Sequence, residues 1–321
     1  MNHESVGQLL LSKREFLKIS GKGILVAAIG VSSVGRLMNA AAQYLPEDER
    51  KDSGEVDDSG FFQEAINRCF PGEQVIIPWR EEGYCLRQAI HLKDKTVLLG
   101  EGDENHKIKI FFLPSKNEYQ SIFYGQSLKN IEIGGFSLHS EFTYDRLVDI
   151  FYGTSLSSNI LGIHLTDSYN CFLHDIEGQG LEYLFKIDSN RSGTTRDYQI
   201  DNIFSENVHT PIYLGRARKI YGRNWNLGCP HASETTRYDH QLYIAGDSEE
   251  IIIDRLVGWG GREFAIQISG YKNQRARDIT ISNIELLDKV FTCVTEGYVS
   301  DISLSGLVRD THTGITTHFK F

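Results

Sequence analysis

Short apolar segments alternate with polar turns along most of this chain. The stretch DHQLYIAGDSEEIIIDRLVGWG, residues 239–260, contains two such segments, Leu242–Ile244 and Ile251–Leu256. Each has the pattern of a half-buried strand, in which successive side chains point inward and outward. Strands this short bury too little apolar surface to be stable alone, so we expect them to stack on neighbours of the same kind.

The same two-strand unit recurs along the chain at a variable period of about 25 residues, which is typical of a solenoid whose loops differ in length. The first strands align on their last inward residues, which are Leu165, Ile187, Leu214, Ile244, Ile268 and Val294. The second strands align on Ile176, Ile203, Trp225, Leu256, Ile284 and Leu307.

A column of turn-forming residues stands directly before the aligned residues of the second strands. Its members are Asp175, Asn202, Asn224, Arg255, Asn283 and Gly306. Side-chain amides stacked about 4.8 Å apart can hydrogen-bond to one another along the axis of a solenoid. The turns are too short for the helices of about 10–15 residues that a βαβ fold needs, and the L-x-x-L-x-L frame of leucine-rich repeats is absent.

This column resembles the asparagine ladder of right-handed parallel β-helices of the pectate lyase superfamily. We therefore predict an all-β chain folded as a single-stranded right-handed parallel β-helix with an N-terminal capping helix. Residues 57–102 support this, because DDSGFFQEAI, VIIP, GYCL and VLLGEG resemble the N-terminal cap of that superfamily. Apolar residues between Phe61 and Cys69 recur at helical spacing, and short strands are expected at Val75–Ile77, Tyr84–Leu86 and Val97–Leu99.

The predicted organisation has one folded body. Residues 58–115 form the cap and the first coils, residues 116–310 the parallel β-helix, and residues 311–321 a tail that either pairs as a final strand or covers the far end. Residues 43–57 are polar and charged and are expected to be a linker.

The first 42 residues have the pattern of an export signal. A basic pair, Lys13–Arg14, precedes a weakly apolar run and a small-residue segment at Ala40–Ala42. The segment resembles a twin-arginine signal with lysine in place of the first arginine. The apolar run is too short for a membrane span of about 20 residues. We therefore expect a periplasmic or secreted protein with no stable membrane span once the signal is removed.

The net charge and the cysteine content limit the kinds of partner and metal site that we expect. The formal net charge is −10, and an acidic body repels the phosphates of nucleic acid. The five cysteines include no C-x-x-C pair, which argues against a cysteine zinc site and a regular disulfide framework. Most of them are expected to be buried small apolar residues, with a Cys69–Cys85 bridge left open. The sequence does not predict the oligomeric state.

The resemblance also implies where a ligand would lie. In this superfamily the asparagine turn separates the second and third sheets, so the first strands here form the first sheet, along whose outer face members usually bind saccharides. Its outward positions are His164, Lys186, Tyr213, Tyr243 and Gln267, followed by Thr166, Asp188 and Ser269. Coils about 4.8 Å apart match the repeat of a linear glycan, and aromatic faces stack on sugar rings. Polysaccharide is therefore the expected partner.

Adjacent loops add further polar side chains to this face. We assign catalytic roles to Lys186, Arg216, Tyr243 and His240. We assign substrate contacts to His164, Asp188, Arg191, Tyr213, Arg237, Asp239 and Gln267.

Three chemistries could act on a glycan bound at this face. A polygalacturonase-like hydrolase needs grouped carboxylates, and the N-T-D, D-D and G-H-G motifs of that family are missing from the groove. A calcium-dependent lyase would need converging acidic ligands, for which Asp188 with Asp239 or Asp247 are the candidates, so Ca²⁺ stays an alternative with no certain cofactor. A lyase or epimerase acting on a uronate-containing glycan fits best. Lys186 and Arg216 would neutralise the carboxylate or Lys186 would remove the C5 proton, with Tyr213, Tyr243 and His240 transferring protons.

A non-catalytic role is the alternative. The chain also resembles exported β-helix proteins encoded with exopolysaccharide assembly systems, such as those for colanic acid, which have no established reaction. Fold alone does not separate an enzyme from a glycan-binding protein.

Overall fold

The computed structural model describes residues 56–102, 106–114, 120–140, 160–190, 194–229, 240–260, 264–270, 274–287, 291–311 and 313–320. The predicted export signal, residues 1–42, and most of the predicted linker lie outside these residues. Within the described part, no helix is long and apolar enough to cross a membrane.

Two sheets form the body, a twelve-stranded sheet A and an eight-stranded sheet B. Sheet A contains β1 (Gln74–Ile77), β2 (Tyr84–Leu86), β4 (Val97–Gly100), β5 (Ile108–Phe112), β7 (Lys129–Ser140), β9 (Tyr169–Gln179), β11 (Arg196–Glu206), β13 (Arg218–Gly228), β15 (Glu249–Trp259), β17 (Ala276–Leu287), β19 (Val299–Arg309) and β20 (Thr316–Lys320). Sheet B contains β3 (Ile90–His91), β6 (Gln120–Gln126), β8 (Ile160–Thr166), β10 (Tyr183–Asp188), β12 (Ile212–Gly215), β14 (Leu242–Ala245), β16 (Phe264–Ser269) and β18 (Phe291–Glu296).

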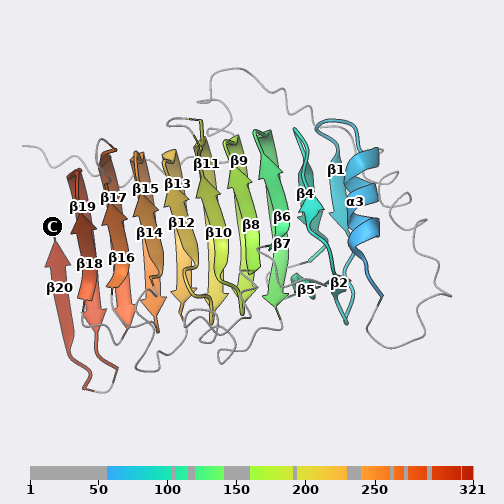
Figure 1. Ribbon diagram of the computed structural model, residues 1–321. Helices are drawn as coiled ribbons and strands as arrows, with labels where there is room; N and C mark the ends of the chain where they lie inside the picture. Colours follow the sequence, from blue (N-terminus) through green and yellow to red (C-terminus); the bar gives the residue numbers. More distant parts are fainter. Residues whose placement is uncertain are drawn as a thin grey trace, which may run out of the picture.

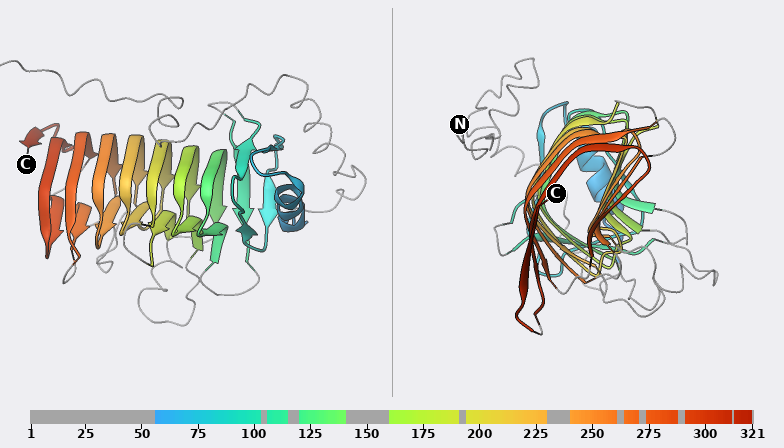
Figure 2. Two further views of the ribbon diagram at one scale, coloured as in Figure 1. Left: turned by 90° about the horizontal axis from the view of Figure 1, so that it is seen from above. Right: turned by 90° about the vertical axis from the view of Figure 1, so that its left-hand side faces the viewer.

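The chain alternates between the two sheets and advances by one coil each time. Along sheet A the strands run β7-β9-β11-β13-β15-β17-β19, and along sheet B they run β6-β8-β10-β12-β14-β16-β18, all paired in parallel. Figure 1 shows the stacked coils from the side, and Figure 2 shows along the axis that each coil encloses a narrow interior. The predicted fold, a right-handed parallel β-helix, is confirmed.

Each long strand of sheet A from β7 to β17 bends at a residue in the left-handed conformation. The bend positions are Gly135, Asp175, Asn202, Asn224, Arg255 and Asn283, all with positive φ. Asparagine and aspartate tolerate this conformation better than other non-glycine residues. The amide of Asn202 donates to Asp175 at 3.0 Å, and the amide of Asn224 donates to Asn202 at 3.0 Å. The predicted ladder is therefore present over these three coils.

The ladder changes partners at Arg255. Asn283 donates instead to Oδ1 of Asp254, at 2.6 Å. A second column of left-handed residues starts these strands and β19, at Asn130, Asn170, Asp197, Lys219, Glu250, Asp278 and Asp301. Two bends at fixed positions in each strand from β7 to β17 keep successive coils in register, because side chains on one coil lie directly above their counterparts on the next.

Inward side chains of both sheets fill the interior. The aligned residues Leu165, Ile187 and Leu214 of sheet B and Ile176, Ile203 and Trp225 of sheet A are buried. Burying one such side chain contributes about 1.5–3 kcal/mol. The stack is therefore continuous from the cap to β17.

The two ends of the solenoid are covered differently. Helix α3 (Ser59–Arg68) buries Phe62 and Ile66 at the N-terminal end, where the Phe62 ring meets Tyr84 edge-on at 5.2 Å. Its predicted position and the three cap strands are confirmed. At the other end β20 pairs antiparallel with β19, so the tail forms a final strand. Figure 1 shows α3 and β20 at opposite ends.

Three predicted alignments near the C-terminal end are wrong. Ile268 pairs with Thr295 rather than Val294, so the first-strand column shifts by one residue. Ile284 pairs with Gly306, which puts Leu307 beside Glu285 and removes Gly306 from the ladder. The cause of the Gly306 and Leu307 shifts is an irregularity in the β17–β19 register between Ile281 and Ile284, which a repeat pattern does not reveal.

The described cysteines behave as small apolar residues. Cys85, Cys171 and Cys229 are buried, and together with Cys69 they form no disulfide. A Cys69–Cys85 bridge is therefore not made. Burial raises the pKa of the Cys171 thiol to about 12, which makes this thiol unreactive at neutral pH.

Candidate functional site

One row of outward side chains crosses sheet B. His164 pairs in register with Lys186, Lys186 with Tyr213, Tyr213 with Tyr243, and Tyr243 with Gln267. Tyr124 extends the row on the N-terminal side, opposite His164. Neighbouring members are about 4.8 Å apart at the backbone. The predicted register of this row is found, and we call it the central row.

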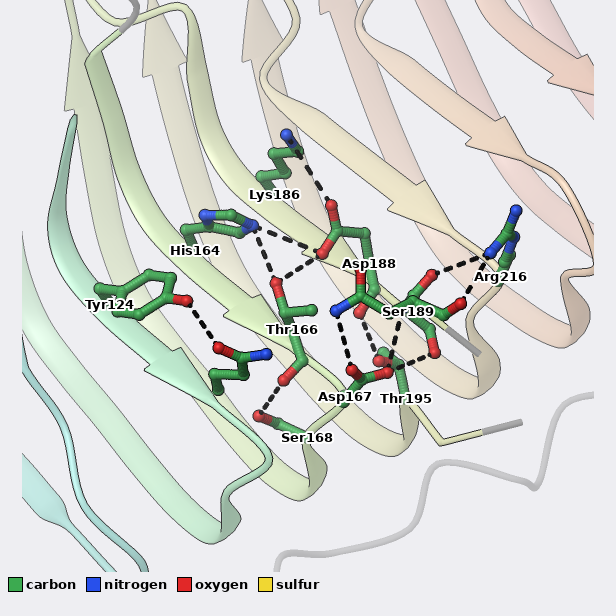
Figure 3. A network of polar contacts seen from close by, with 12 residues as sticks. Tyr124, His164, Thr166, Asp167, Ser168, Lys186, Asp188, Ser189, Thr195 and Arg216 are labelled. Atoms are coloured by element: carbon green, nitrogen blue, oxygen red, sulfur yellow. Dashed lines mark hydrogen bonds and ion pairs between the residues drawn. The ribbon is translucent and has the colours of Figure 1, made fainter. Parts of the chain in front are cut away.

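The carboxylate of Asp188 contacts three side chains beside the central row (Figure 3). The Thr166 hydroxyl donates to Oδ1 of Asp188 at 2.7 Å, and Nε2 of His164 lies 3.0 Å from that hydroxyl and 3.4 Å from Oδ1. Nζ of Lys186 lies 3.8 Å from Oδ2. The hydroxyl proton of Thr166 points to Asp188. Nε2 of His164 must therefore itself carry a proton in order to hydrogen-bond to the Thr166 oxygen.

These contacts set the charge of Asp188. Burial alone would raise its pKa, but the hydrogen bonds from His164 and Thr166 and the charge of Lys186 hold the pKa below its ordinary value. Asp188 is therefore an anion at neutral pH. It can orient His164 and Lys186 or accept a hydrogen bond from a sugar hydroxyl, but it cannot serve as an acid.

Tyrosines dominate the middle of the row. The ring of Tyr213 meets those of Tyr183 and Tyr243 edge-on, with centroids 5.8 Å and 5.3 Å apart. The Tyr213 ring also lies over Gly215, where a Cβ atom would come within 2.8 Å of it and within 3.2 Å of the Asp188 Cβ. Gly215 therefore lets the Tyr213 ring lean towards Asp188. Burial raises the pKa of Tyr183 well above its ordinary value, so this phenol stays protonated.

The far end of the row ends in a smaller polar group. Gln267 donates through Nε2 to the Ser269 hydroxyl at 3.2 Å and to Glu296 at 3.3 Å. An amide, a hydroxyl and a carboxylate here offer hydrogen bonds suited to sugar hydroxyls. Gln267 keeps its predicted substrate-binding position, and its role stays a prediction.

Arg216 and His240 lie at opposite ends of the short strands, as predicted, but neither side chain is fully accessible from the central row. Arg216 follows β12 in a left-handed turn, and its guanidinium donates to the backbone carbonyls of Ser189 and Asn190 (Figure 3). His240 precedes β14 and is only 4% exposed, with its ring 5.8 Å from that of Tyr243. Their catalytic roles stay predictions. Arg191, Arg237 and Asp239 lie outside the described residues.

Two members of this face, Tyr124 and Tyr183, were not predicted from the sequence. Regular alternation from Lys186 would turn Tyr183 inward. Instead Leu184 and Phe185 are both buried, which shifts the alternation and leaves Tyr183 half-buried against Tyr213. Two consecutive large apolar residues were the available signal. Tyr124 could be found only by extending the row one coil across the long insertion before residue 160.

A second polar cluster lies on the outer face of sheet A. Nδ1 of His174 lies 2.7 Å from Asp175 and Nε2 lies 3.4 Å from Glu132. Burial alone would lower the pKa of His174, but these carboxylates raise it overall. Beside it the buried carboxylate of Asp201 accepts hydrogen bonds from Gln199 at 2.6 Å and Arg223 at 2.9 Å. Every one of these groups has a protein partner, which indicates a structural role.

The described residues contain no group of three or more His, Cys, Asp or Glu side chains that could hold a metal ion. Asp239, one candidate for the calcium alternative, is not among them. The other two candidates, Asp188 and Asp247, already have cationic partners, Lys186 and Arg218 respectively.

No protein-family model matches the sequence, and no curated protein matches it significantly. Among solved structures, the pre-mature form of bacteriophage phi29 gene product 12 is similar with a TM-score of 0.64 and 19% identity over 83% of this chain and 36% of that chain. The N-terminal fragment of the same gene product gives a TM-score of 0.61 and 19% identity over 83% of this chain and 46% of that chain. This chain spans less than half the length of these two relatives.

A third similar structure is a 1,3-α-1,4-β-D-galactose-4-sulfate 3,6-anhydro-D-galactose-2-sulfate 4 galactohydrolase. Its TM-score is 0.48 at 17% identity, over 82% of this chain and 60% of that chain. Over 83% of its length this chain shares its fold with both phage structures.

Proposed function

We propose that this protein is exported to the periplasm or beyond and binds an acidic polysaccharide along the outer face of sheet B. The central row is the observation that carries the proposal. Cationic, aromatic and amide side chains follow one another on consecutive strands at about the spacing of successive sugars. Tyr213 and Tyr243 would stack on sugar rings, while Lys186 would attract a uronate carboxylate.

We further propose lyase or epimerase chemistry at Lys186. Both reactions begin when a base removes the proton from C5 of a uronate, next to its carboxylate. Lys186 would neutralise the carboxylate or, in its uncharged form, take this proton, and the Tyr213 and Tyr243 hydroxyls would carry protons beside it. Asp188 would hold Lys186 and His164 in place, since it contacts both.

On strand β10 the carboxylate spacing argues against a glycoside hydrolase. Such enzymes place two carboxyl groups about 5–9.5 Å apart. On β10 the carboxylates are Asp188 at one end and Glu182 just before the other. Six residues at about 3.3 Å each separate their backbones by about 20 Å, which is too far for one glycosidic bond.

Glycan binding without turnover is the second candidate function. It is favoured by the pairing of the cationic groups within the protein, since Lys186 contacts Asp188 and Arg216 donates to two backbone carbonyls. A cation that already has an anionic partner attracts a uronate less strongly, and it can still donate hydrogen bonds to hydroxyls.

One assay separates these functions. The purified protein is incubated with polygalacturonate or alginate, and absorbance of the new C4–C5 double bond is followed together with solvent deuterium incorporation at C5. A lyase gives absorbance, an epimerase gives deuterium only, and a binding protein gives neither. In the catalytic cases Lys186→Ala should lower the rate at least 100-fold. Tyr243→Phe, which keeps the ring, should lower turnover more than binding.

A further inference from the structure

Charged side chains are sparse along the outer face of sheet B. Lys186 is the only lysine or arginine in the central row between Tyr124 and Gln267, all of whose members the structure describes. A second row stands two residues further along the same strands, and its described members are Gln126, Thr166, Asp188, Gly215, Ala245, Ser269 and Glu296. Within this described row the carboxylates of Asp188 and Glu296 are the only charged groups. The two rows therefore offer an anionic ligand one lysine and no arginine.

The charge of Lys186 is already partly balanced within the protein. Its Nζ lies 3.8 Å from Oδ2 of Asp188. Arg216, at the edge of the face, donates to the backbone carbonyls of Ser189 and Asn190 instead of pointing along the row (Figure 3). Lys186 can thus attract one carboxylate of a bound chain, and it has no charge left for carboxylates on the sugars that follow.

The next position along the row disfavours a second carboxylate. A Cβ atom on Gly215 would lie 3.0 Å from the hydroxyl oxygen of Tyr213 and 3.2 Å from Cβ of Asp188, so the phenol and the aspartate flank the same glycine. A uronate stacked on Tyr213 would bring its carboxylate towards that of Asp188 and towards the electron-rich face of the ring. A neutral sugar would stack equally well, and its hydroxyls could donate to Asp188.

The far end of the row has an acceptor where a uronate would need a cation. Gln267 donates to Glu296 at 3.3 Å, and the Ser269 hydroxyl lies 3.5 Å from the same carboxylate oxygen. This end is three coils beyond Lys186, or about 14 Å. Sugar hydroxyls can donate to the carboxylate of Glu296, whereas a uronate placed here would meet a like charge.

The charge pattern can be compared with the pattern of two kinds of acidic glycan. A chain made only of uronates would present a carboxylate at about every coil, 4.8 Å apart. This is less than the Debye length of about 8 Å at physiological salt, so each carboxylate needs a cation of its own. Beyond Lys186 the described face supplies none. A chain with one uronate among neutral sugars needs only Lys186.

We infer that the ligand of this face is a heteropolysaccharide that places a single uronate at Lys186 and neutral sugars at Tyr213, Tyr243 and Gln267. This inference rests on the proposed binding of an acidic glycan along sheet B, and it holds for an enzyme and for a binding protein alike. A chain made only of uronates binds through the same residues but at least tenfold more weakly.

Three synthetic heptasaccharides with identical linkages test the inference. The first has glucuronate at its central position and glucose elsewhere, the second consists of glucuronate only, and the third of glucose only. Each is titrated calorimetrically into the purified protein at physiological salt. We expect the chain with a single glucuronate to bind at least tenfold more tightly than either of the others.

A cation added at the far end of the row should reverse this preference. Gln267→Lys places an ammonium group where the second chain has an unpaired carboxylate. The affinity for the glucuronate-only chain, relative to that for the chain with a single glucuronate, should rise at least tenfold. The matched control is Thr280→Lys, which adds the same charge on the outer face of sheet A, beside the exposed Ile252. It should change the ratio less than twofold.

The possible outcomes separate this inference from the proposed function. If the wild-type protein binds the glucuronate-only chain as tightly as the chain with a single glucuronate, or more tightly, the inference is wrong and glycan binding stands. An equal rise in the ratio for Thr280→Lys would show that net charge sets the preference, which also overturns the inference. If none of the three chains binds, the proposed glycan-binding function fails and the inference fails with it.

Discussion

The hydroxyl of Thr166 donates a 2.7 Å hydrogen bond to the carboxylate of Asp188, which occupies the same position on the next coil. The bond joins two coils across the outer face of sheet B. It also holds Asp188 where His164 and Lys186 can both reach it. Stacking thus turns two residues 22 apart in sequence into a single unit.

Replacing Thr166 by valine should destabilise the protein by about 1–2 kcal/mol, because a hydrogen bond to a charged group is lost. Asp188 has a lowered pKa in the folded state, so its contribution to stability is present above the unfolded-state value of about 3.9 and is lost as pH falls through the folded value. The difference between wild type and Thr166→Val in urea unfolding should therefore be constant near neutral pH and shrink below about pH 4. A difference that grows on acidification would contradict this assignment.

His174 should give the opposite pH dependence. Its pKa is raised in the folded state by Asp175 and Glu132. Its contribution to stability is therefore complete below the unfolded value of about 6.5 and is lost as pH rises through the folded value. As the pH rises from 5.5 to 8.5, the melting temperature of the wild type should fall further than that of His174→Gln. Equal losses in the two proteins would show that the His174 contacts carry no net charge pairing.

Much of the fold can be predicted from the sequence, because two short strands and a polar turn recur with their inward residues in step. The register of His164, Lys186, Tyr213 and Tyr243 follows from the same repeat. Prediction of the register from the repeat fails where the repeat is irregular. The shift between Ile281 and Ile284 moved Leu307 out of its column.

Contacts within the site are less predictable than the register. The outward positions of Lys186 and Asp188 predict that these residues share a face. The tilt of Tyr213 over Gly215 and the direction of the Arg216 side chain depend instead on side-chain packing. The pattern of apolar and polar residues along the chain does not predict such packing.

The interruption of the ladder predicts a stabilising change. Arg255 is left-handed with φ of 66° and stands between Asn224 and Asn283 in the bend column. Arg255→Asn should suit this backbone better and let the new amide donate to Asn224, which would raise stability by about 0.5–1.5 kcal/mol. Asn202→Ala should lower stability by a similar amount or more, since it removes two bonds of the ladder. Urea unfolding would check both, and destabilisation by Arg255→Asn would show that the ladder cannot be extended here.

The coil interior should not tolerate charge. Ile268→Asp or Ile281→Asp should abolish soluble folded protein, because each would bury an unpaired carboxylate in the stack. Ile252→Asp is the matched control on β15, where the side chain is 42% exposed. It should melt near the wild-type temperature. Normal melting of both interior variants would contradict the coil alignment.

The most direct test of the central claim is calorimetric titration of a uronate hexasaccharide into the wild-type protein and aromatic variants from two faces. Tyr213→Ala and Tyr243→Ala remove rings from the outer face of sheet B, while Tyr221→Ala removes one from the outer face of sheet A. We predict that each sheet B change weakens binding at least tenfold and that Tyr221→Ala leaves the affinity within a factor of two. Unchanged affinity in both sheet B variants, or an equal loss in Tyr221→Ala, would contradict it.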